Sequence, residues 1–419
     1  MTEKNKSVKK FPNSGNIPKL RFSEFTEEWG TKTLGKIGQV INGLTYSPND
    51  IDERGVLVLR SSNVQSRTIT FTDNVFVKAN NFNPVKENDI LICVRNGSKN
   101  LIGKNALVKK QNEGLAFGAF MAIYRSEFNR FLFQWFDTKD YKDIVNKNLG
   151  ATINSINGGD LKKFKVPFPS LEEQEKIASF LSLIDERILS QKKIISQLKS
   201  QMSNLKDLIF EQKLRLKNDN GIYFPSWKFF RLSDLGNTFN GLSGKTKEHF
   251  GSGQKYIQYK QIFDSAKINI ADCAFVDIEE NENQNIVKYG DVFFTISSET
   301  PEEIGMSSVL LEKVNNVYLN SFCFGFRSHS FDELIPEFSQ FLFRSNGFRN
   351  EIVKLAQGST RYNMSKIEFL KLKVKLPGKD EQIKIASFLS SIQEKIETEK
   401  QILEKLELQK KFLLGNLFV

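Results

Sequence analysis

Apolar residues recur at alternating steps of four and three in two stretches of the chain, one in the middle and one at the end. The first series is Ile177, Leu181, Ile184, Ile188, Gln191, Ile195, Leu198, Met202, Leu205 and Ile209. The second series is Ile385, Leu389, Ile392, Ile396, Glu399, Leu403, Leu406, Lys410, Leu413 and Leu417. This spacing is the seam of a coiled coil and predicts long helices over 169–216 and 377–419. The alternative is two helices that pack in separate cores.

The predicted start of the first helix carries a capping signal. Pro169 stops the preceding strand, Ser170 can cap the helix, and Glu173 completes a capping box. The second start repeats this pattern with Pro377, Gly378 and Glu381.

Both predicted helices carry more apolar surface than a two-stranded coil covers. The additional residues lie one position before seam residues and are Phe180, Ile194, Phe388 and Ile402. We expect a partner subunit to dock on them, and packing against the chain's own globular parts is the alternative. Gln191 and Glu399 place a polar side chain at the equivalent seam position of each helix, where it either fixes register or reflects a half-exposed seam.

The remaining sequence carries short β-rich runs such as VLVLR, DILICV, DVFFTI and FCFGFR, separated by Gly, Asn and Ser turns. A helical stretch near FLFQWFDTKDYKDIV is mirrored by FLFRSNGFRNEIV. We therefore predict two α+β modules, module one over 20–168 and module two over 217–376. A loose basic N-terminal arm over 1–19 precedes them.

The chain repeats once along its length. Trp29 recurs as Trp227, Asp89 as Asp291, and EQEKIASFLS from Glu173 reappears as EQIKIASFLS from Glu381. Because the ends of a domain are commonly close together, module two should hold the end of the first helix beside the start of the second. The helices are then antiparallel. The modules are expected at opposite ends of the pair, related by a pseudo-two-fold axis.

The chain has an excess of basic residues, which points toward a polyanionic partner. The 419 residues contain 60 Lys and Arg against 49 Asp and Glu, a net charge of +11, which favours nucleic acid but also fits an AT-rich genome. The three cysteines lack the spacing of a zinc site or a disulfide framework. No apolar run approaches the length of a membrane span, and a cytoplasmic protein is expected.

Catalytic motifs are missing from the sequence. The two histidines, His249 and His329, stand 80 residues apart, so a His-based metal site or general base is poorly supplied. The string GLSGKT at 241–246 lacks the first glycine of a phosphate-binding loop, because Phe239 stands there. We expect no catalytic residue and no metal ligand in this chain.

Two β-rich modules alternating with two near-identical helices closely resemble the specificity (S) subunit of type I restriction–modification systems. The matching motifs are the Pro-x-x-x-Glu-Gln helix openings followed by K-I-A-S-F-L-S, the entry from Ile17 to Trp29, and Gly358-Ser359-Thr360 upstream of Pro377. The resemblance implies that each module is a target-recognition domain for one half of a bipartite, asymmetric duplex DNA site. It also implies two methyltransferase (M) subunits docked on the helices, restriction (R) subunits, and S-adenosylmethionine, ATP and Mg on those partners.

Loops that follow strands and carry polar donors are the candidate DNA contacts. In module one they are Asn42, Thr45, Tyr46, Arg60, Ser61, Ser62, Asn63, Arg95, Asn96, Ser98, Lys99, Thr152 and Asn154. In module two they are Lys245, Lys247, Gln258, Tyr259, Lys260, Gln261, Ser297, Ser298, Arg361, Tyr362 and Asn363. Arg95-Asn96-Gly97-Ser98 resembles an Arg-x-Gly loop of the family. The aligned Ser297-Ser298-Glu299-Thr300 lacks both Arg and Gly, which puts a shared role of this loop in doubt.

Two other functions remain open from the residues alone. A single-chain restriction or modification enzyme would methylate or cut DNA without added subunits. A coiled-coil scaffold without a role on DNA would show no duplex binding even at low salt.

Overall fold

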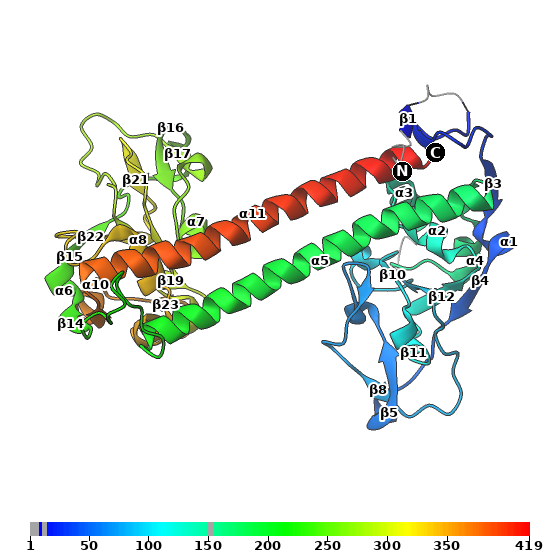
Figure 1. Cartoon of the computed structure of the whole chain (residues 1–419), viewed down its shortest axis with the longest axis horizontal. Coiled ribbons are helices and arrows are strands. Elements are labelled where there is room, and N and C mark those ends of the chain that lie inside the picture. The colour runs from blue at the N-terminus through cyan, green and yellow to red at the C-terminus, as the bar shows by residue number, and fades with distance from the viewer. Residues whose placement is uncertain (1–7, 11–14, 150–153) are drawn as a thin grey trace. The chain divides into compact units, whose positions relative to one another are not determined.

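The computed structural model describes residues 8–10, 15–149 and 154–419. The chain divides into two compact units, unit 1 with Met1–Lys192 and Gln401–Val419, and unit 2 with Lys193–Lys400 (Figure 1). Within the predicted N-terminal arm, β1 (Val8–Lys10) pairs antiparallel with β2 (Leu20–Phe22). Residues 1–7 and 11–14 of that arm lie outside the described residues.

Module one mixes short strands and short helices. Its further elements are β3 (Gly30–Thr33), α1 (Leu34–Ile37), β4 (Gln39–Asn42), β5 (Ile51–Leu59), β6 (Val64–Gln65), β7 (Thr68–Ile69), β8 (Phe76–Val77), β9 (Ile90–Cys93), β10 (Asn105–Leu107), β11 (Ala116–Phe117), β12 (Met121–Arg125), α2 (Asn129–Trp135), α3 (Lys139–Lys147), α4 (Gly158–Lys163) and β13 (Lys165–Phe168). The predicted runs VLVLR and DILICV form the end of β5 and all of β9.

Module two follows a similar order of elements. They are β14 (Lys228–Arg231), α6 (Leu232–Leu235), β15 (Gly236–Asn240), β16 (Phe250–Ile257), α7 (Tyr259–Asp264), β17 (Ala274–Val276), β18 (Val292–Thr295), β19 (Ser297–Ser298), β20 (Ser307–Val309), β21 (Val317–Leu319), β22 (Cys323–Ser328), α8 (Pro336–Leu342), α9 (Asn346–Val353), β23 (Tyr362–Asn363), α10 (Lys366–Lys371) and β24 (Lys373–Leu376). Helix α7 lies where module one has β6 and β7, and β19 and β23 are two additional short strands.

The internal repeat is visible in the sheet topology. Module one has a four-stranded antiparallel sheet in the order β10-β9-β12-β4, and module two has β20-β18-β22-β15. A three-stranded sheet follows in each, β11-β5-β8 and β21-β16-β17, and a two-stranded sheet, β3-β13 and β14-β24. The α+β fold with one internal repeat is therefore confirmed.

The inner strands of the four-stranded sheets form the centre of each core. All four residues of β9 and all four of β18 are buried, which explains why both read as continuous apolar runs. The recurring acid and arginine of the sequence form an ion pair in each module. Asp89 binds Arg125 at 2.6 Å, and Asp291 binds Arg327 at 2.7 Å.

The heptad pattern forms two long helices, α5 (Leu171–Phe210) and α11 (Lys379–Leu417). Every residue of the two predicted seams is buried or half-buried, as a seam requires. In unit 1, Asp185 of α5 pairs with Lys410 of α11 at 2.6 Å, and Lys192 pairs with Glu407 at 2.7 Å. Residue numbers in α11 fall as those in α5 rise, so the two segments run antiparallel.

Unit 2 shows the same pairing at the other helix ends. Met202 and Ile209 of α5 share a hydrophobic cluster with Ile385 and Leu389 of α11. In each unit, the end of one long helix thus packs beside the start of the other (Figure 1).

An aromatic trio joins each module to the end of the helix that belongs to the other repeat. In unit 1, the Phe418 ring lies 6.2 Å from that of Trp29 and 5.4 Å from that of Phe131. In unit 2, Phe210 lies 6.0 Å from Trp227 and 5.5 Å from Phe338. The final turn of α5 completes the core of module two, and the segment after α11 completes that of module one.

The helix openings are tied to these same tryptophans. Glu173 accepts hydrogen bonds from Trp29 Nε1 at 3.1 Å and from Arg21 Nε and Nη2 at 2.8 Å each. The Ser170 hydroxyl caps α5 by accepting from the Glu173 amide at 3.3 Å. The Glu173 carboxylate, expected to complete a capping box, instead binds Arg21 and Trp29, because their buried donors need an acceptor.

The second opening repeats the tryptophan contact. Glu381 accepts from Trp227 Nε1 at 3.2 Å. Burial raises the pKa of Glu381, although Trp227 and the more distant Arg215 act in the opposite direction. The Glu-Gln motif of each repeat therefore anchors a module to the start of its own long helix.

Candidate nucleic-acid interface

The candidate loops of module one meet at one edge of the module. Strand β12 runs antiparallel to both β4 and β9, so β4 and β9 point the same way and their following loops lie at the same edge. There, Asn96 Nδ2 donates to Ser61 Oγ at 3.0 Å, and Asn154 Nδ2 donates to the Gly97 carbonyl at 3.0 Å. The structure thus brings together the predicted loops around residues 61, 96 and 154.

The loop after β4 reaches the same edge through a close backbone approach. The Leu44 amide donates to the Phe117 carbonyl at 2.7 Å. A Cβ atom on Gly43 would collide with the backbone of Phe117 and Gly118, and one on Gly241 would collide with Leu319 and Asn320 in module two. The repeated Asn-Gly-Leu motif therefore places the residues after β4 and β15 against the turn that leads into β12 and β22.

Module two gathers its candidates around Ser297. Strand β19 pairs with β23 through Ser297 with Asn363 and Ser298 with Tyr362. Arg361 Nε donates to Ser297 Oγ at 2.9 Å, and the Tyr259 hydroxyl donates to the Ser297 carbonyl at 2.7 Å. Residues 259, 297 and 361–363 thus form one cluster.

Several candidates are enclosed by the protein itself. Asn63 is fully buried, and its amide donates to the carbonyls of Thr70 and Asp73. Ser297 and Ser298 are also buried, inside the β19–β23 pairing. The Lys245 side chain is enclosed by an ion pair with Glu282. Because these four side chains are bonded within the protein, we expect them to shape the loops rather than to contact DNA.

The other described candidates reach the surface. Those exposed are Asn42, Thr45, Arg95, Ser98, Lys99, Lys247, Gln258, Lys260, Arg361 and Asn363. Those half-buried are Tyr46, Arg60, Ser61, Ser62, Asn96, Asn154, Tyr259, Gln261 and Tyr362. Thr152 lies outside the described residues.

Sequence reasoning missed two exposed aromatic residues at these edges, Phe120 and Phe322. Most phenylalanines belong to the core, and no pattern of polarity marks these two. The available signal was their recurrence, because both stand in the turn before the last strand of the repeat-equivalent sheets.

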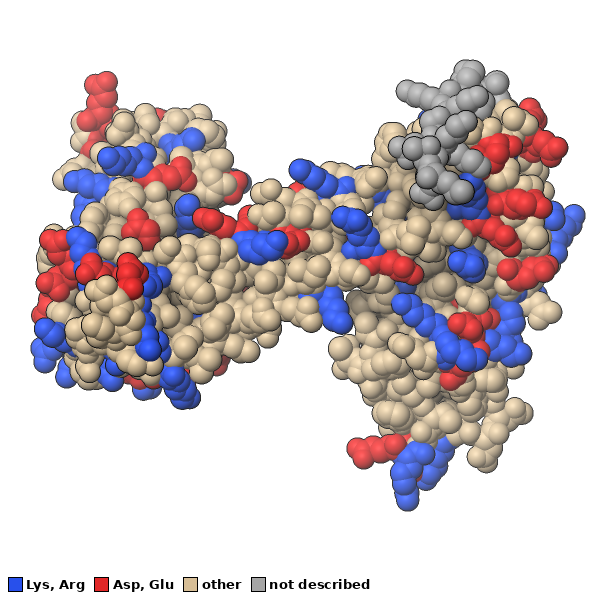
Figure 2. All heavy atoms as spheres, viewed as in Figure 1, with Lys and Arg blue, Asp and Glu red and all other residues tan. Residues whose placement is uncertain are grey.

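The charged side chains on the face drawn in Figure 2 are spread rather than clustered by sign. On the face drawn in Figure 2, Lys and Arg side chains are interspersed with Asp and Glu in both units. The excess of positive charge therefore forms no single continuous patch on that face.

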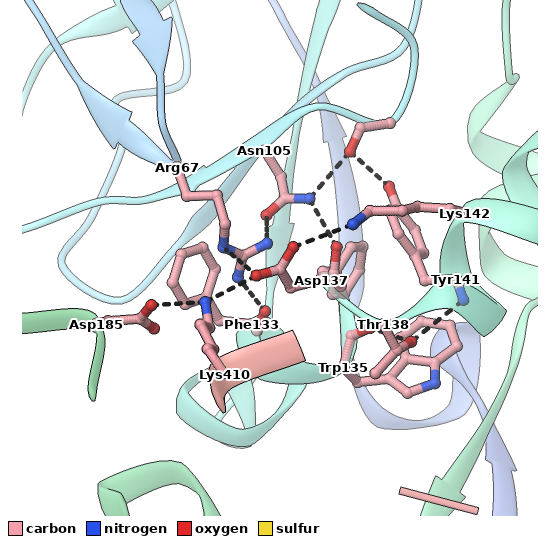
Figure 3. Close-up of polar contacts among 12 residues, drawn as sticks. Arg67, Asn105, Phe133, Trp135, Asp137, Thr138, Tyr141, Lys142, Asp185 and Lys410 are labelled. Carbon is pink, nitrogen blue, oxygen red and sulfur yellow. Dashed lines mark hydrogen bonds and ion pairs between the residues drawn. The ribbon is translucent and has the colours of Figure 1, made fainter. Parts of the chain in front are cut away.

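A charged network fastens module one to the two long helices inside unit 1 (Figure 3). The seam residue Lys410 pairs with Asp185 at 2.6 Å and with Asp137 at 2.7 Å. Arg67 approaches Asp137 at 3.5 Å, donates to Asn105 Oδ1 at 2.9 Å, and lies 3.8 Å from the Phe133 ring centroid. A groove of about 850 Å³ opens beside this network, so water still reaches it.

We expect Lys410→Met to destabilise unit 1 by about 1–3 kcal/mol at pH 7, because two carboxylates lose their shared partner in a half-buried site. Burial raises the pKa of Asp137, but Arg67 and Lys410 outweigh it, and the net pKa lies below its ordinary value. The ionised form of Asp137 therefore stabilises the fold above the unfolded-state pKa of about 3.9. That contribution disappears as the pH falls through the lower folded-state pKa.

Hydrogen exchange of unit 1 peptides at pH 7 and in acid measures this difference, after correction for intrinsic exchange rates. The gap between wild type and Lys410→Met should shrink below pH 4. Lys411→Met, which alters an exposed neighbour, is the matched control and should leave exchange unchanged. A gap that grows in acid would contradict the network's assigned role.

The four predicted docking residues differ in exposure. Ile194, Phe388 and Ile402 are exposed. Phe180 is half-buried and packs edge-on against Phe22 of the chain's own β2, with ring centroids 5.8 Å apart. Part of the apolar stripe in the first repeat is therefore covered by the chain itself.

A family profile described as the type I restriction modification DNA specificity domain matches this chain twice, at residues 26–200 and 225–408. The chain therefore belongs to this family of DNA specificity proteins. The two matches coincide with the two copies of the repeat, and they confirm the resemblance seen in the sequence.

Named relatives place the chain more closely within the family. It is 25% identical over 352 residues to the specificity subunit of the EcoKI type I restriction enzyme of Escherichia coli strain K12, covering 78% of this chain and 74% of that protein. It is 26% identical over 433 aligned positions to the protein of Methanocaldococcus jannaschii assigned as the MjaX specificity subunit, covering 96% and 95%. The relatives are specificity subunits, which confirms a non-catalytic role and lends no support to a single-chain enzyme or a scaffold.

Solved structures share the fold. The type I restriction–modification S subunit from M. genitalium superposes with a TM-score of 0.60 at 17% identity, covering 96% of this chain and 99% of that one. A chain from a structure on complex assembly and conformational transition of the type I R-M system gives 0.54 at 16% identity, covering 93% and 97%. Among the described residues, no helix is long and apolar enough to cross a membrane.

Proposed function

We propose that this protein reads a bipartite, asymmetric duplex DNA site, with one half bound at the loop edge of each module. The observation that carries the proposal is the pairing of one repeated topology with two different sets of loop residues. Equivalent positions hold Arg95-Asn96-Gly97-Ser98 in module one and Ser297-Ser298-Glu299-Thr300 in module two. Two modules with the same topology but different loop residues would recognise two different half-sites.

The exposed residues at these edges suit both parts of DNA binding. Lys99, Lys247 and Lys260 can neutralise phosphates, which makes affinity fall with salt. The amides of Asn42 and Asn363 can both donate and accept, and the guanidinium of Arg95 donates, so all three can distinguish base edges in the major groove.

The protein would work with catalytic partners in the cytoplasm, where its DNA lies. Two methyltransferase subunits, one for each repeat, would dock on the exposed apolar side chains Ile194, Phe388 and Ile402 of the long helices. Restriction subunits would join that core. S-adenosylmethionine, ATP and Mg would be bound by these partners; within the described part of the chain, no group of three His, Cys, Asp or Glu residues could hold a metal ion.

Reconstitution tests this proposal. The full chain is purified alone and together with the methyltransferase subunit of its host, and each sample is assayed for duplex binding and methyl transfer. We expect salt-dependent binding by the chain, methylation only in the complex, and two methyltransferase subunits per chain by native mass spectrometry. Methylation by the chain alone would favour a single-chain enzyme, and no duplex binding at low salt by either sample would favour a scaffold.

The helix pair should set the spacing between the two half-sites. Insertion of four residues after Ser196, with four after Glu404 at the matching place in α11, lengthens each helix by about 6 Å. Because base pairs are stacked about 3.4 Å apart, we expect the spacer of the methylated site to grow by about one to two base pairs. Methylome sequencing reads the spacer directly, and an unchanged spacer would contradict this role. Insertion in α5 alone is the control and should abolish methylation, because it shifts one seam against the other.

A further inference from the structure

Each module exposes one phenylalanine beside one arginine at its loop edge. Phe120 is 56% exposed, and the Arg95 guanidinium lies 5.8 Å from its ring centroid. Phe322 is 55% exposed, and the Arg361 guanidinium lies 5.7 Å from its ring centroid. Rings this exposed add little to the core, and what distinguishes these two is the guanidinium beside each of them.

The two phenylalanines occupy equivalent places in the repeat. Phe120 stands just before β12, and its carbonyl accepts from the Val94 amide at 3.0 Å. Phe322 stands just before β22, and its carbonyl accepts from the Ile296 amide at 3.0 Å. The same backbone contact fixes each ring at the edge where the candidate DNA contacts meet.

The two arginines, in contrast, come from different positions in the repeat. Arg95 follows β9, and the residue at its place in module two is the buried Ser297. Arg361 reaches this place from the neighbouring segment, and its Nε donates to Ser297 Oγ. The arginine beside the exposed ring therefore comes from non-equivalent positions in the two modules. Its presence in both indicates that the arginine–phenylalanine pair has a function.

We propose that Arg95 with Phe120, and Arg361 with Phe322, are base-reading pairs, one for each half-site. The guanidinium would donate two parallel hydrogen bonds to O6 and N7 of a guanine, and the ring would contact an adjacent thymine methyl group. This inference rests on the proposed function and names residues that carry its specificity.

The ring gives the arginine a defined position before DNA arrives. Stacking over an aromatic face restricts the long, flexible arginine side chain. The side chain therefore loses less conformational freedom when its guanidinium binds a base. A lysine carries the same charge but has no planar fork and cannot make the bidentate contact. Arginine-to-lysine variants therefore separate base reading from simple attraction to phosphate.

The test maps methylated bases in cells that carry the host methyltransferase subunit and one variant of this chain. We expect Arg95→Lys to relax the choice of base at one position of one half-site by tenfold or more, and Arg361→Lys to do the same in the other half. Phe120→Leu and Phe322→Leu, which keep apolar bulk, should weaken methylation of the same half-sites about tenfold.

Phe229→Leu is the matched control. Phe229 is 67% exposed and has the Lys375 ammonium 4.8 Å from its ring centroid, but it lies in β14, away from the loop edges. This variant should leave the methylated site and its level unchanged. Equal thermal unfolding midpoints for all variants would show that folding is not the cause of any change.

The outcomes distinguish this inference from the function on which it rests. If the wild-type complex methylates no bipartite site, the proposed function fails. If it does, but Arg95→Lys and Arg361→Lys keep both half-sites intact and change only salt sensitivity, the arginines contact phosphate and the base-reading inference is overturned.

Discussion

Replacing Phe418 by alanine should destabilise unit 1 by about 3–5 kcal/mol, the usual cost of truncating a buried phenylalanine. The Phe418 ring packs against both Trp29 and Phe131, so its removal leaves a cavity between module one and the two long helices. Phe210→Ala should destabilise unit 2 in the same way but by less, because the Phe210 ring contacts Trp227 and Phe338 but is only half-buried.

Hydrogen exchange followed by mass spectrometry measures the two units separately. Phe418→Ala should raise exchange in module one and leave module two protected, whereas Phe210→Ala should show the reverse. Phe412→Ala is the control, because that side chain is exposed on α11 shortly before Phe418 and its loss should cost less than about 0.5 kcal/mol. If Phe418→Ala raised hydrogen exchange equally in both modules, the result would contradict the assignment of Phe418 to the core of module one.

Replacing Arg21 by methionine should have an effect of similar size. Arg21 and Glu173 are both buried and form a bidentate pair, and breaking such a pair costs about 3–5 kcal/mol because one charge stays buried without its partner. The double variant Arg21→Met with Glu173→Leu removes both charges and should recover most of that loss.

The second repeat supplies the comparison for this pair. Arg215 reaches the carbonyls of Phe224 and Pro225, and its influence on Glu381 is only a longer-range attraction. Arg215→Met should therefore destabilise unit 2 by less than half as much as Arg21→Met destabilises unit 1. Urea unfolding followed by hydrogen exchange reports both values. A double variant no more stable than Arg21→Met alone would show that the ion pair is not the cause.

The long helices were predictable because their signal is local and repeated. The seam residues from Ile177 to Ile209 and from Ile385 to Leu417 are buried or half-buried in α5 and α11. The strands around DILICV and DVFFTI were predictable for the same reason, because strands buried on both faces need continuous apolar runs.

Contacts between distant segments were not predictable. The sequence shows Trp29 recurring as Trp227 and Phe210 recurring as Phe418, but recurrence alone does not indicate that the phenylalanines close the cores around the tryptophans. Likewise, the missing arginine of Ser297-Ser298-Glu299-Thr300 suggested that the two loops differ in role, whereas Arg361 supplies a guanidinium at that place from the segment just before β23.

Among the loop candidates, burial distinguishes donors that lie at the surface from donors that are bonded within the protein. Asn63 and Ser298 stand in polar loops after strands, just as Arg95 does, yet both are buried and bonded within the protein. All three residues are polar and follow a strand, so only the packing of neighbouring segments distinguishes them.

Mapping of methylated bases in the host, with this gene intact and with it deleted, tests the central claim most directly. If two modules with different loop residues are held by one helix pair, methylation should fall on two dissimilar half-sites separated by a constant spacer. Deletion of the gene should abolish this methylation completely. Methylation that persists without the gene, or that falls on palindromic sites without a spacer, would contradict the account.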